Sequence, residues 1–169
     1  MSGASNGPVR LVCFDWGGVI LKHCRSWEEA CAVAGLPVRE GCNLPHRIAR
    51  RREVTRAYQC GELAPEEFFQ ALAAAGDHQY TPGEIELLHE AWITEEYEGI
   101  AAVIERLVSL PSIETAMLSN TNHAHWQRQL GPGRRGPRFP TAALLKHRHA
   151  SHLLGHVKPG EEIYRAFEQ

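Results

Sequence analysis

The chain has 169 residues, of which 43% are hydrophobic and 22% are charged, as in an ordinary soluble globular protein. Its 18 Lys and Arg residues nearly balance its 20 Asp and Glu residues, for a formal net charge of −2. This balance provides no strongly basic surface, so we expect neither nucleic acid nor an anionic membrane as a partner. The length suits one compact domain, or a core with a small inserted lobe.

The cysteines are five in number and contain no C-x-x-C pair: Cys13, Cys24, Cys31, Cys42 and Cys60. They predict neither a disulfide framework nor a zinc site, which favours a reducing cytoplasm. The first eight residues lack the basic and then apolar order of a signal peptide. No apolar run approaches the roughly 20 residues that span a bilayer. We therefore expect a cytoplasmic protein without a membrane partner.

Residues 9–14 (VRLVCF) form a short apolar run that is rich in β-forming residues and ends at Asp15, before Gly17 and Gly18. The pattern predicts a buried strand that stops at a turn. Cys13 lies inside the run and is predicted to be a small core residue.

Residues 21–98 are predicted to be helical throughout. Ser26 and Glu29 have the spacing of a capping box, as do Thr81 and Glu84. Pro65 is suited to a first helical position, and apolar residues recur along one face of the segment that follows it. The stretch therefore predicts an inserted block of several helices.

Helical periodicity returns in residues 100–107, and residues 113–118 then predict a second strand, which leads into Ser119 and Asn120. A strand, a helical block, a helix and a strand indicate an α/β fold, with a Rossmann-like parallel sheet and an all-helical insertion after the first strand. The predicted core comprises residues 1–20 and 99–169, and the predicted insertion comprises residues 21–98.

The late part of the chain gives weaker signals. Residues 131–140 form a basic Gly/Pro-rich loop, in which three arginines are interpreted as a mobile surface segment: Arg134, Arg135 and Arg138. Residues 146–152 are too rich in His and Arg to predict a buried strand, and residues 161–169 predict a final helix. Six histidines are interpreted as solvated or partly packed residues: His123, His125, His147, His149, His152 and His156. The spacing of His152 and His156 would suit two metal ligands on one helix, but no acidic or thiol ligand follows nearby.

The candidate site is a set of side chains at the ends of the two predicted strands. Because the carboxyl ends of parallel strands meet at one edge of a sheet, Asp15 and Ser119 are expected to face the same crevice. A carboxylate there can act as a covalent nucleophile in phosphoryl transfer. Gly17 and Gly18 allow a phosphate to approach their amide groups, and Lys158 can offset negative charge as it develops.

These residues lie in three ordered motifs that resemble those of haloacid-dehalogenase (HAD)-like hydrolases. FDWGGVI (14–20) resembles the first motif, in the subgroup with Gly two residues after the nucleophile, and LSNTN (118–122) is similar to the second. SHLLGHVKP (151–159) resembles the approach to the third. The segment from QCGEL (59–63) to residue 68 resembles the middle of the cap in sugar-phosphate-phosphatase-like members.

The resemblance implies a role for each matching position. Asp15 would be the nucleophile and a magnesium ligand, and the main-chain carbonyl of Gly17 would be a second ligand. Gly18, Ser119 and Asn120 would bind the phosphate, with Asn120 supporting Ser119. Lys158 would bridge Asp15 and the phosphoryl group, and residues 21–98 would form a cap over a small phosphorylated metabolite.

Two departures from the family pattern bear on activity. Most phosphatases of the family carry an acid/base Asp where this chain has Gly17, and its loss would slow catalysis by about 10²–10⁴-fold. The chain also ends shortly after Lys158, before an acidic fourth motif that completes the magnesium site. We therefore expect a shortened member that lacks C-terminal core strands, with an exposed sheet edge at which a second chain can associate.

Three functions remain open on the sequence. The first is a magnesium-dependent phosphatase that forms an aspartyl phosphate. The second is a catalytically impaired or inactive domain that acts as a binding or interaction module. The third is a haloacid dehalogenase, which needs no metal but usually carries an aromatic residue at the position of Gly17.

Overall fold

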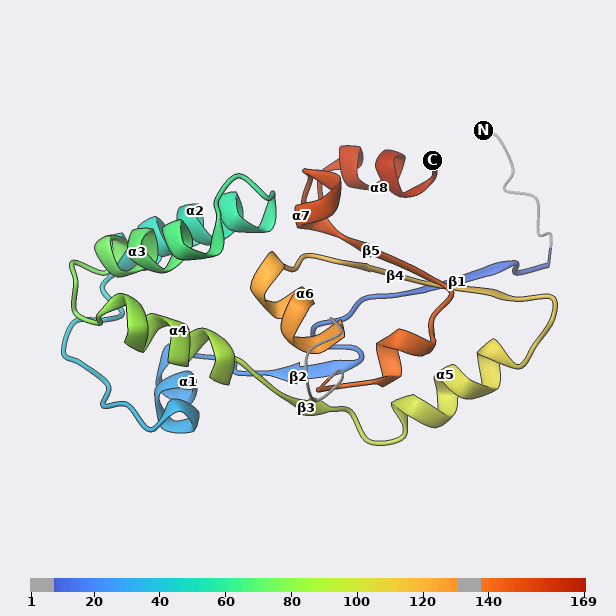
Figure 1. Cartoon of the computed structure of the whole chain (residues 1–169), viewed down its shortest axis with the longest axis horizontal. Coiled ribbons are helices and arrows are strands. Elements are labelled where there is room, and N and C mark those ends of the chain that lie inside the picture. The colour runs from blue at the N-terminus through green and yellow to red at the C-terminus, as the bar shows by residue number, and fades with distance from the viewer. Residues whose placement is uncertain (1–7, 131–137) are drawn as a thin grey trace.

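The computed structural model describes residues 8–130 and 138–169 and consists of a parallel sheet joined to a cluster of helices (Figure 1). The strands are β1 (Leu11–Phe14), β2 (Leu21–His23), β3 (Ile93–Glu96), β4 (Glu114–Ser119) and β5 (His147–Ala150). The helices are α1 (Trp27–Ala34), α2 (Pro45–Gln59), α3 (Pro65–Ala75), α4 (Pro82–Ala91), α5 (Ile100–Val108), α6 (His123–Leu130), α7 (Ser151–Leu154) and α8 (Glu161–Phe167), with a 3₁₀ turn, η1, at Thr141–Leu144.

The sheet has the order β1-β4-β5, and both of its strand pairs are parallel. Helices α7 and α8 lie on one side of it and α5 lies on the other (Figure 1). β4 is the central strand, and five of its six residues are buried. The prediction of a Rossmann-like α/β core with a parallel sheet is therefore confirmed.

β1 is an edge strand, and the prediction that it is buried is wrong. Its residues alternate between exposed and half-buried, Leu11 is 42% exposed, and Cys13 is exposed rather than part of the core. The reason is topological, because β1 pairs only with β4 in the described part of the chain. Its apolar composition suits a strand with a neighbour on each side.

Residues 21–98 form the predicted block of helices, α1 to α4, but they are not helical throughout. Their two ends form β2 and β3, which pair antiparallel in a separate two-stranded ribbon. The pairing partners lie about 70 residues apart in the sequence, so local periodicity could not reveal them. Both chain crossings between the sheet and the helices run through this ribbon (Figure 1).

Local signals place the helix ends as predicted. Ser26 caps α1 by accepting a hydrogen bond from the amide of Glu29, and Gly35 ends α1 in a left-handed conformation. The Glu29 carboxylate accepts from the amide of Arg25 instead of that of Ser26, so this box is only half formed. Thr81 and Glu84 form the complete box at α4.

The apolar interior has two clusters. One fills the helical segment around Tyr58, Phe68 and Leu88. The other lies between the sheet and the ribbon and includes Trp16 and Met117. The site described below lies where these two parts of the molecule meet.

Two late segments differ from the sequence expectations. Residues 147–150 form β5, in which only Ala150 is buried, and this explains why no buried strand was evident. His152 lies on the short helix α7, whereas His156 lies beyond it and is exposed, so they do not share a helix face.

Arg134 and Arg135 lie outside the described residues, and Arg138 packs over the ring of Phe139. The predicted final helix is present as α8. Within the described residues, none of the helices has the length and apolar character needed to cross a membrane.

Candidate active site

Asp15 follows β1 directly, and both of its carboxylate oxygens have partners. Oδ1 accepts a hydrogen bond of 2.7 Å from the amide of Trp16. Oδ2 lies 2.8 Å from Nζ of Lys158. The Asp15 side chain is 43% exposed, so a ligand can still reach the carboxylate. The sequence-based expectation that these two residues meet agrees with this geometry.

Lys158 is held by the end of β4 as well as by Asp15. Its Nζ donates to the carbonyl of Leu118 at 2.8 Å. The Asn120 amide fixes its main chain, accepting from the Lys158 amide at 2.8 Å and donating to the Lys158 carbonyl at 2.9 Å. The ammonium is therefore positioned before any ligand arrives. Asn120, which was expected to bind phosphate and support Ser119, instead has both amide atoms bound to Lys158.

Ser119 is the last residue of β4, is buried, and lines the same cavity as Asp15 and Lys158. Its position agrees with the expectation that Asp15 and Ser119 share one crevice at the strand ends. Three groups from distant parts of the sequence thus share one site: a carboxylate, a hydroxyl and an ammonium.

The turn after Asp15 differs from the expectation at Gly18. Its φ of +79° is a left-handed conformation that favours glycine. Its amide, however, donates to the Leu21 carbonyl at 2.8 Å and closes the turn, so it is not free to bind a phosphate. Gly17 lines the cavity. A Cβ at position 17 would lie 3.6 Å from Cδ2 of His23, so the imidazole occupies the space beside the missing side chain.

The cavity has a volume of about 850 Å³ and joins the sheet end to the helical segment. That is near the upper end of the usual range for small-molecule sites. Its sheet end is polar, whereas its helical side is mostly aromatic and aliphatic. The helical side is lined by Trp27, Arg51, Thr55, Gln59, Phe68, Leu72, Ile85, Leu88, His89 and Trp92.

Several of these residues could not be identified from the sequence. His89 on α4 and His125 on α6 stack with ring centroids 3.7 Å apart, and Nε2 of His125 donates to the His89 carbonyl at 2.8 Å. Burial lowers the pKa of His125 to about 4 and holds that of His89 well below its usual value, with the neighbouring His125 adding to the effect. Both rings are therefore neutral at neutral pH, and only three-dimensional proximity identifies the pair.

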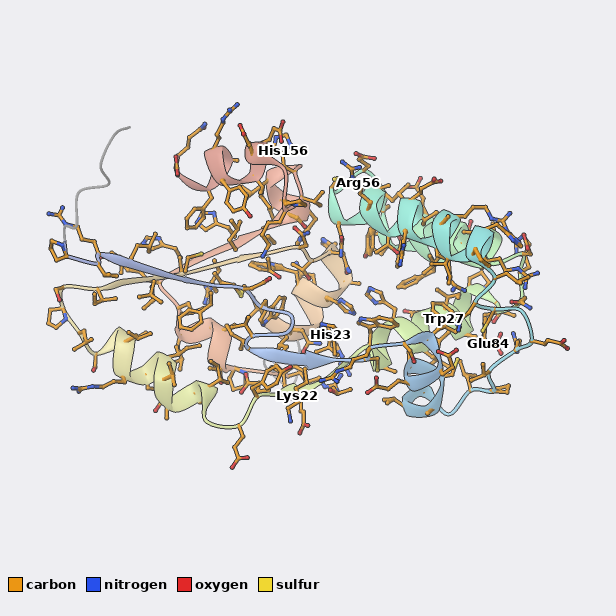
Figure 2. The ribbon with its side chains drawn as sticks, turned by 180° about the vertical axis from the view of Figure 1, so that it is seen from behind. Lys22, His23, Trp27, Arg56, Glu84 and His156 are labelled. Atoms are coloured by element: carbon orange, nitrogen blue, oxygen red, sulfur yellow. The ribbon has the colours of Figure 1, made fainter. Side chains whose placement is uncertain are left out.

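His23 is another residue beside the cavity that could not be identified from the sequence. It ends β2 and lies between the sheet and the helical segment, whereas Trp27 lies on the helical side (Figure 2). Its Nδ1 lies 3.0 Å from the Cys24 carbonyl, which can only accept, so Nδ1–H is the donor.

The oxygen donors at the sheet end fit a magnesium ion in part. The carboxylate of Asp15 and the carbonyl of Gly17 are ligands that Mg²⁺ prefers, and this ion usually retains water and binds substrate phosphate as well. Among the described residues, no group of three or more His, Cys, Asp and Glu side chains is arranged to hold a metal. The protein thus offers one carboxylate and one carbonyl, with the remaining ligands left to phosphate and water.

Comparison with known proteins gives a structural likeness only. No protein-family model matches the sequence, and no curated protein matches it. Among solved structures, a HAD family enzyme from Bacteroides thetaiotaomicron in complex with magnesium and inorganic phosphate has a TM-score of 0.71 at 17% identity. The match covers 95% of this chain and 77% of that one. A predicted HAD-like family hydrolase from Porphyromonas gingivalis gives a TM-score of 0.65 at 20% identity, with 94% and 74% covered.

These similar structures are HAD-family enzymes, and the chain has the Rossmann-like core of their fold. At these identities the likeness establishes the fold and leaves the chemistry to be argued from the residues of the site.

Proposed function

We propose that this chain is a HAD-like hydrolase, a magnesium-dependent phosphatase that acts on a small phosphorylated metabolite through an aspartyl-phosphate intermediate. The single observation that carries the proposal is the 2.8 Å pair of Asp15 and Lys158 in a cavity that Ser119 also lines. A nucleophile, a cation and a hydroxyl donor are the groups that phosphoryl transfer requires.

In the proposed reaction, a carboxylate oxygen of Asp15 attacks phosphorus as the bond from phosphorus to the ester oxygen breaks. The leaving oxygen takes a proton from water. A second water then attacks the phosphorus of the aspartyl phosphate and gives a proton to the hydroxide left by the first water. The bond from phosphorus to the Asp15 oxygen breaks, which releases inorganic phosphate and restores the carboxylate. Lys158 lies beside Asp15 and offsets the charge on the phosphoryl oxygens, while Ser119 donates a hydrogen bond to one of them.

Magnesium would be held by the Asp15 carboxylate and the Gly17 carbonyl. When bound, it supplies positive charge that stabilises the phosphoryl oxygens in the transition state. Because the protein offers few ligands, we expect the ion to bind weakly alone and more tightly together with a phosphate group.

The proposal is tested with an aryl phosphate and magnesium, comparing the wild type with Asp15→Asn. This substitution keeps the shape of the side chain and removes the nucleophile, so kcat should fall by more than about 10³-fold. Lys158→Met should lower kcat by about 10²–10³-fold, as expected for the loss of one charged donor to the transition state. Lys146→Met is the matched control, because Lys146 is exposed and pairs with Glu114. Equal turnover by the wild type and Asp15→Asn would rule out the covalent mechanism.

A second candidate function is an anion-binding module without turnover. Asp15 is the only carboxylate among the described residues that line the cavity, so no second acid is available for proton transfer or metal binding. This function predicts no hydrolysis and no stabilisation by magnesium. A rise in melting temperature with millimolar magnesium, in the presence of phosphate, would contradict it.

A further inference from the structure

The helical side of the cavity contains a buried cation, Arg51 of α2. It is 9% exposed and lines the cavity. One terminal nitrogen donates to the Cys42 carbonyl at 2.8 Å, and the other donates to the Asn43 side chain at 3.3 Å. The guanidinium also lies over the ring of Trp27, 4.2 Å from its centroid. All of these partners are neutral.

Arg51 has no acidic partner. Every Asp and Glu of the chain lies within the described residues, and none has an oxygen within 4.0 Å of the Arg51 guanidinium. Glu28 makes no direct contact with it: the Asn43 side chain bridges the two, and the Glu28 carboxylate interacts with the Arg51 charge from a distance. Neighbouring arginines differ, because Arg47 and Arg50 both pair with Asp77.

A buried charge without a counter-ion is costly, because water no longer solvates it and neutral hydrogen bonds compensate only in part. Burial accordingly lowers the pKa of Arg51. Such a cost is common where a ligand supplies the missing charge, since binding sites are built for the bound state rather than for stability.

The rest of the cavity limits what such a ligand can be. Phe68, Leu72, Ile85 and Trp92 give the helical side apolar walls, and Lys158 lies at the sheet end. One cavity of about 850 Å³ therefore holds two cations, of which only Lys158 is paired with a carboxylate. A phosphate ion alone would leave most of this volume empty.

We propose that Arg51 binds a carboxylate at the end of the substrate remote from the phosphoryl group. The inference rests on the proposed function and narrows its substrate class. The substrate would be a phosphate ester whose organic part has an apolar or aromatic body and carries a free carboxylate. Trp27 covers one face of the guanidinium. Each terminal nitrogen uses one of its two N–H groups on Cys42 or Asn43, which leaves a second N–H on each for a carboxylate.

The test compares two ligands that differ only in the carboxylate: para-(phosphonomethyl)benzoate and benzylphosphonate. Their carbon–phosphorus bonds resist hydrolysis, so isothermal titration calorimetry with magnesium measures binding alone. For the wild type we expect the carboxylate-bearing ligand to bind about 10- to 100-fold more tightly, as for one charge-assisted contact. Arg51→Met should reduce this preference to near unity without weakening benzylphosphonate.

Arg52→Met is the matched control, because Arg52 is the next residue on α2 and is exposed. It should keep the full preference for the carboxylate-bearing ligand. Arg51→Lys keeps the charge but loses the planar donor group, so it should retain part of the preference. It decides the test if Arg51→Met fails to fold, which thermal melting followed by circular dichroism would reveal.

Equal binding of the two ligands by the wild type would overturn the inference. An equal loss of affinity for both ligands in Arg51→Met would also overturn it, because that result indicates a purely structural role. The proposed function fails separately. A clear carboxylate preference in a protein that hydrolyses no phosphate ester would contradict the phosphatase alone, and an active phosphatase with no preference would contradict the role of Arg51 alone. If neither phosphonate binds, the inference about Arg51 is wrong, and the hydrolysis assay decides the proposed function by itself.

Discussion

At the scale of single residues, the molecule places its reactive groups with few and specific contacts. Lys158 is fixed by Asp15, by the Leu118 carbonyl and by the Asn120 amide, so the ends of two strands, β1 and β4, determine where its charge lies. The sequence could predict Asp15, Ser119 and Lys158, because each follows a recognisable strand or motif. It could not predict Arg51 or His89, because nothing local distinguishes them from other helical residues.

A glycine fixes the contact between the helical segment and the sheet segment. Gly61 has a φ of +76°, and a Cβ there would lie 2.5 Å from the carbonyl oxygen of His152. Gly61→Ala should therefore lower the free energy of unfolding by about 2 kcal/mol or more. Urea denaturation measures the change.

The matched substitution is Gly83→Ala in α4. A Cβ at Gly83 meets no atom within 4 Å, and its φ is not positive. This change should be neutral or stabilise the protein by up to about 1 kcal/mol. Similar losses at both glycines would show that the close approach to His152 is not the cause.

The buried histidines predict how stability depends on pH. An unfolded histidine gains a proton as the pH falls through about 6.5, whereas folded His125 stays neutral until about pH 4. Between these values the unfolded state binds more protons, so the free energy of unfolding falls as the pH falls. Through His125 alone, the free energy of unfolding should fall by about 2 kcal/mol between about pH 7 and about pH 5. The lowered pKa of His89 acts in the same direction.

His125→Gln should flatten this part of the stability profile, measured by urea denaturation at the two pH values. His156→Gln is the control, because His156 is exposed and should leave the slope unchanged. An unchanged slope in His125→Gln would refute the assignment. Below about pH 4, where both states are protonated, the free energy of unfolding should not fall further through His125.

At the scale of secondary structure, helix ends are the features that the sequence predicts best, because capping depends on neighbouring residues. Thr81 accepts a hydrogen bond from the Glu84 amide, and the Glu84 carboxylate accepts one from the Thr81 amide. Glu84 also pairs with Arg39, which with the Thr81 amide lowers its pKa to about 2. The spacing of these residues was enough to predict where α4 begins.

Thr81→Ala should destabilise the protein by about 1 kcal/mol, because the Glu84 amide loses its acceptor at the first turn of α4. Thr81→Ser retains the hydroxyl and should remain within a few tenths of a kcal/mol of the wild type. Thermal and urea unfolding of the three proteins measure both values. A loss of equal size in Thr81→Ser would show that the methyl group, rather than the cap, is responsible.

At the scale of the whole molecule, the limits of sequence reasoning follow from long-range pairing. The order of strand, helical block, helix and strand predicted the parallel sheet, because parallel strands require such crossovers. The ribbon of β2 and β3 and the third strand β5 were not predicted, since their pairing joins segments far apart in the chain. The prediction of a buried first strand assumed a neighbour on each side. That a second chain associates at an exposed edge of the sheet remains a prediction.

The two-stranded ribbon has a consequence for how this protein can diverge. Asp15, Ser119 and Lys158 all belong to the sheet side of β2 and β3, whereas Arg51 belongs to the helices that the ribbon carries. Because the chain enters and leaves those helices through adjacent strands, that segment can accumulate substitutions, or be exchanged as a unit, without a break in the sheet. Under the proposed function, natural variation there would alter which substrate is selected, while Asp15, Ser119 and Lys158 are inherited unchanged.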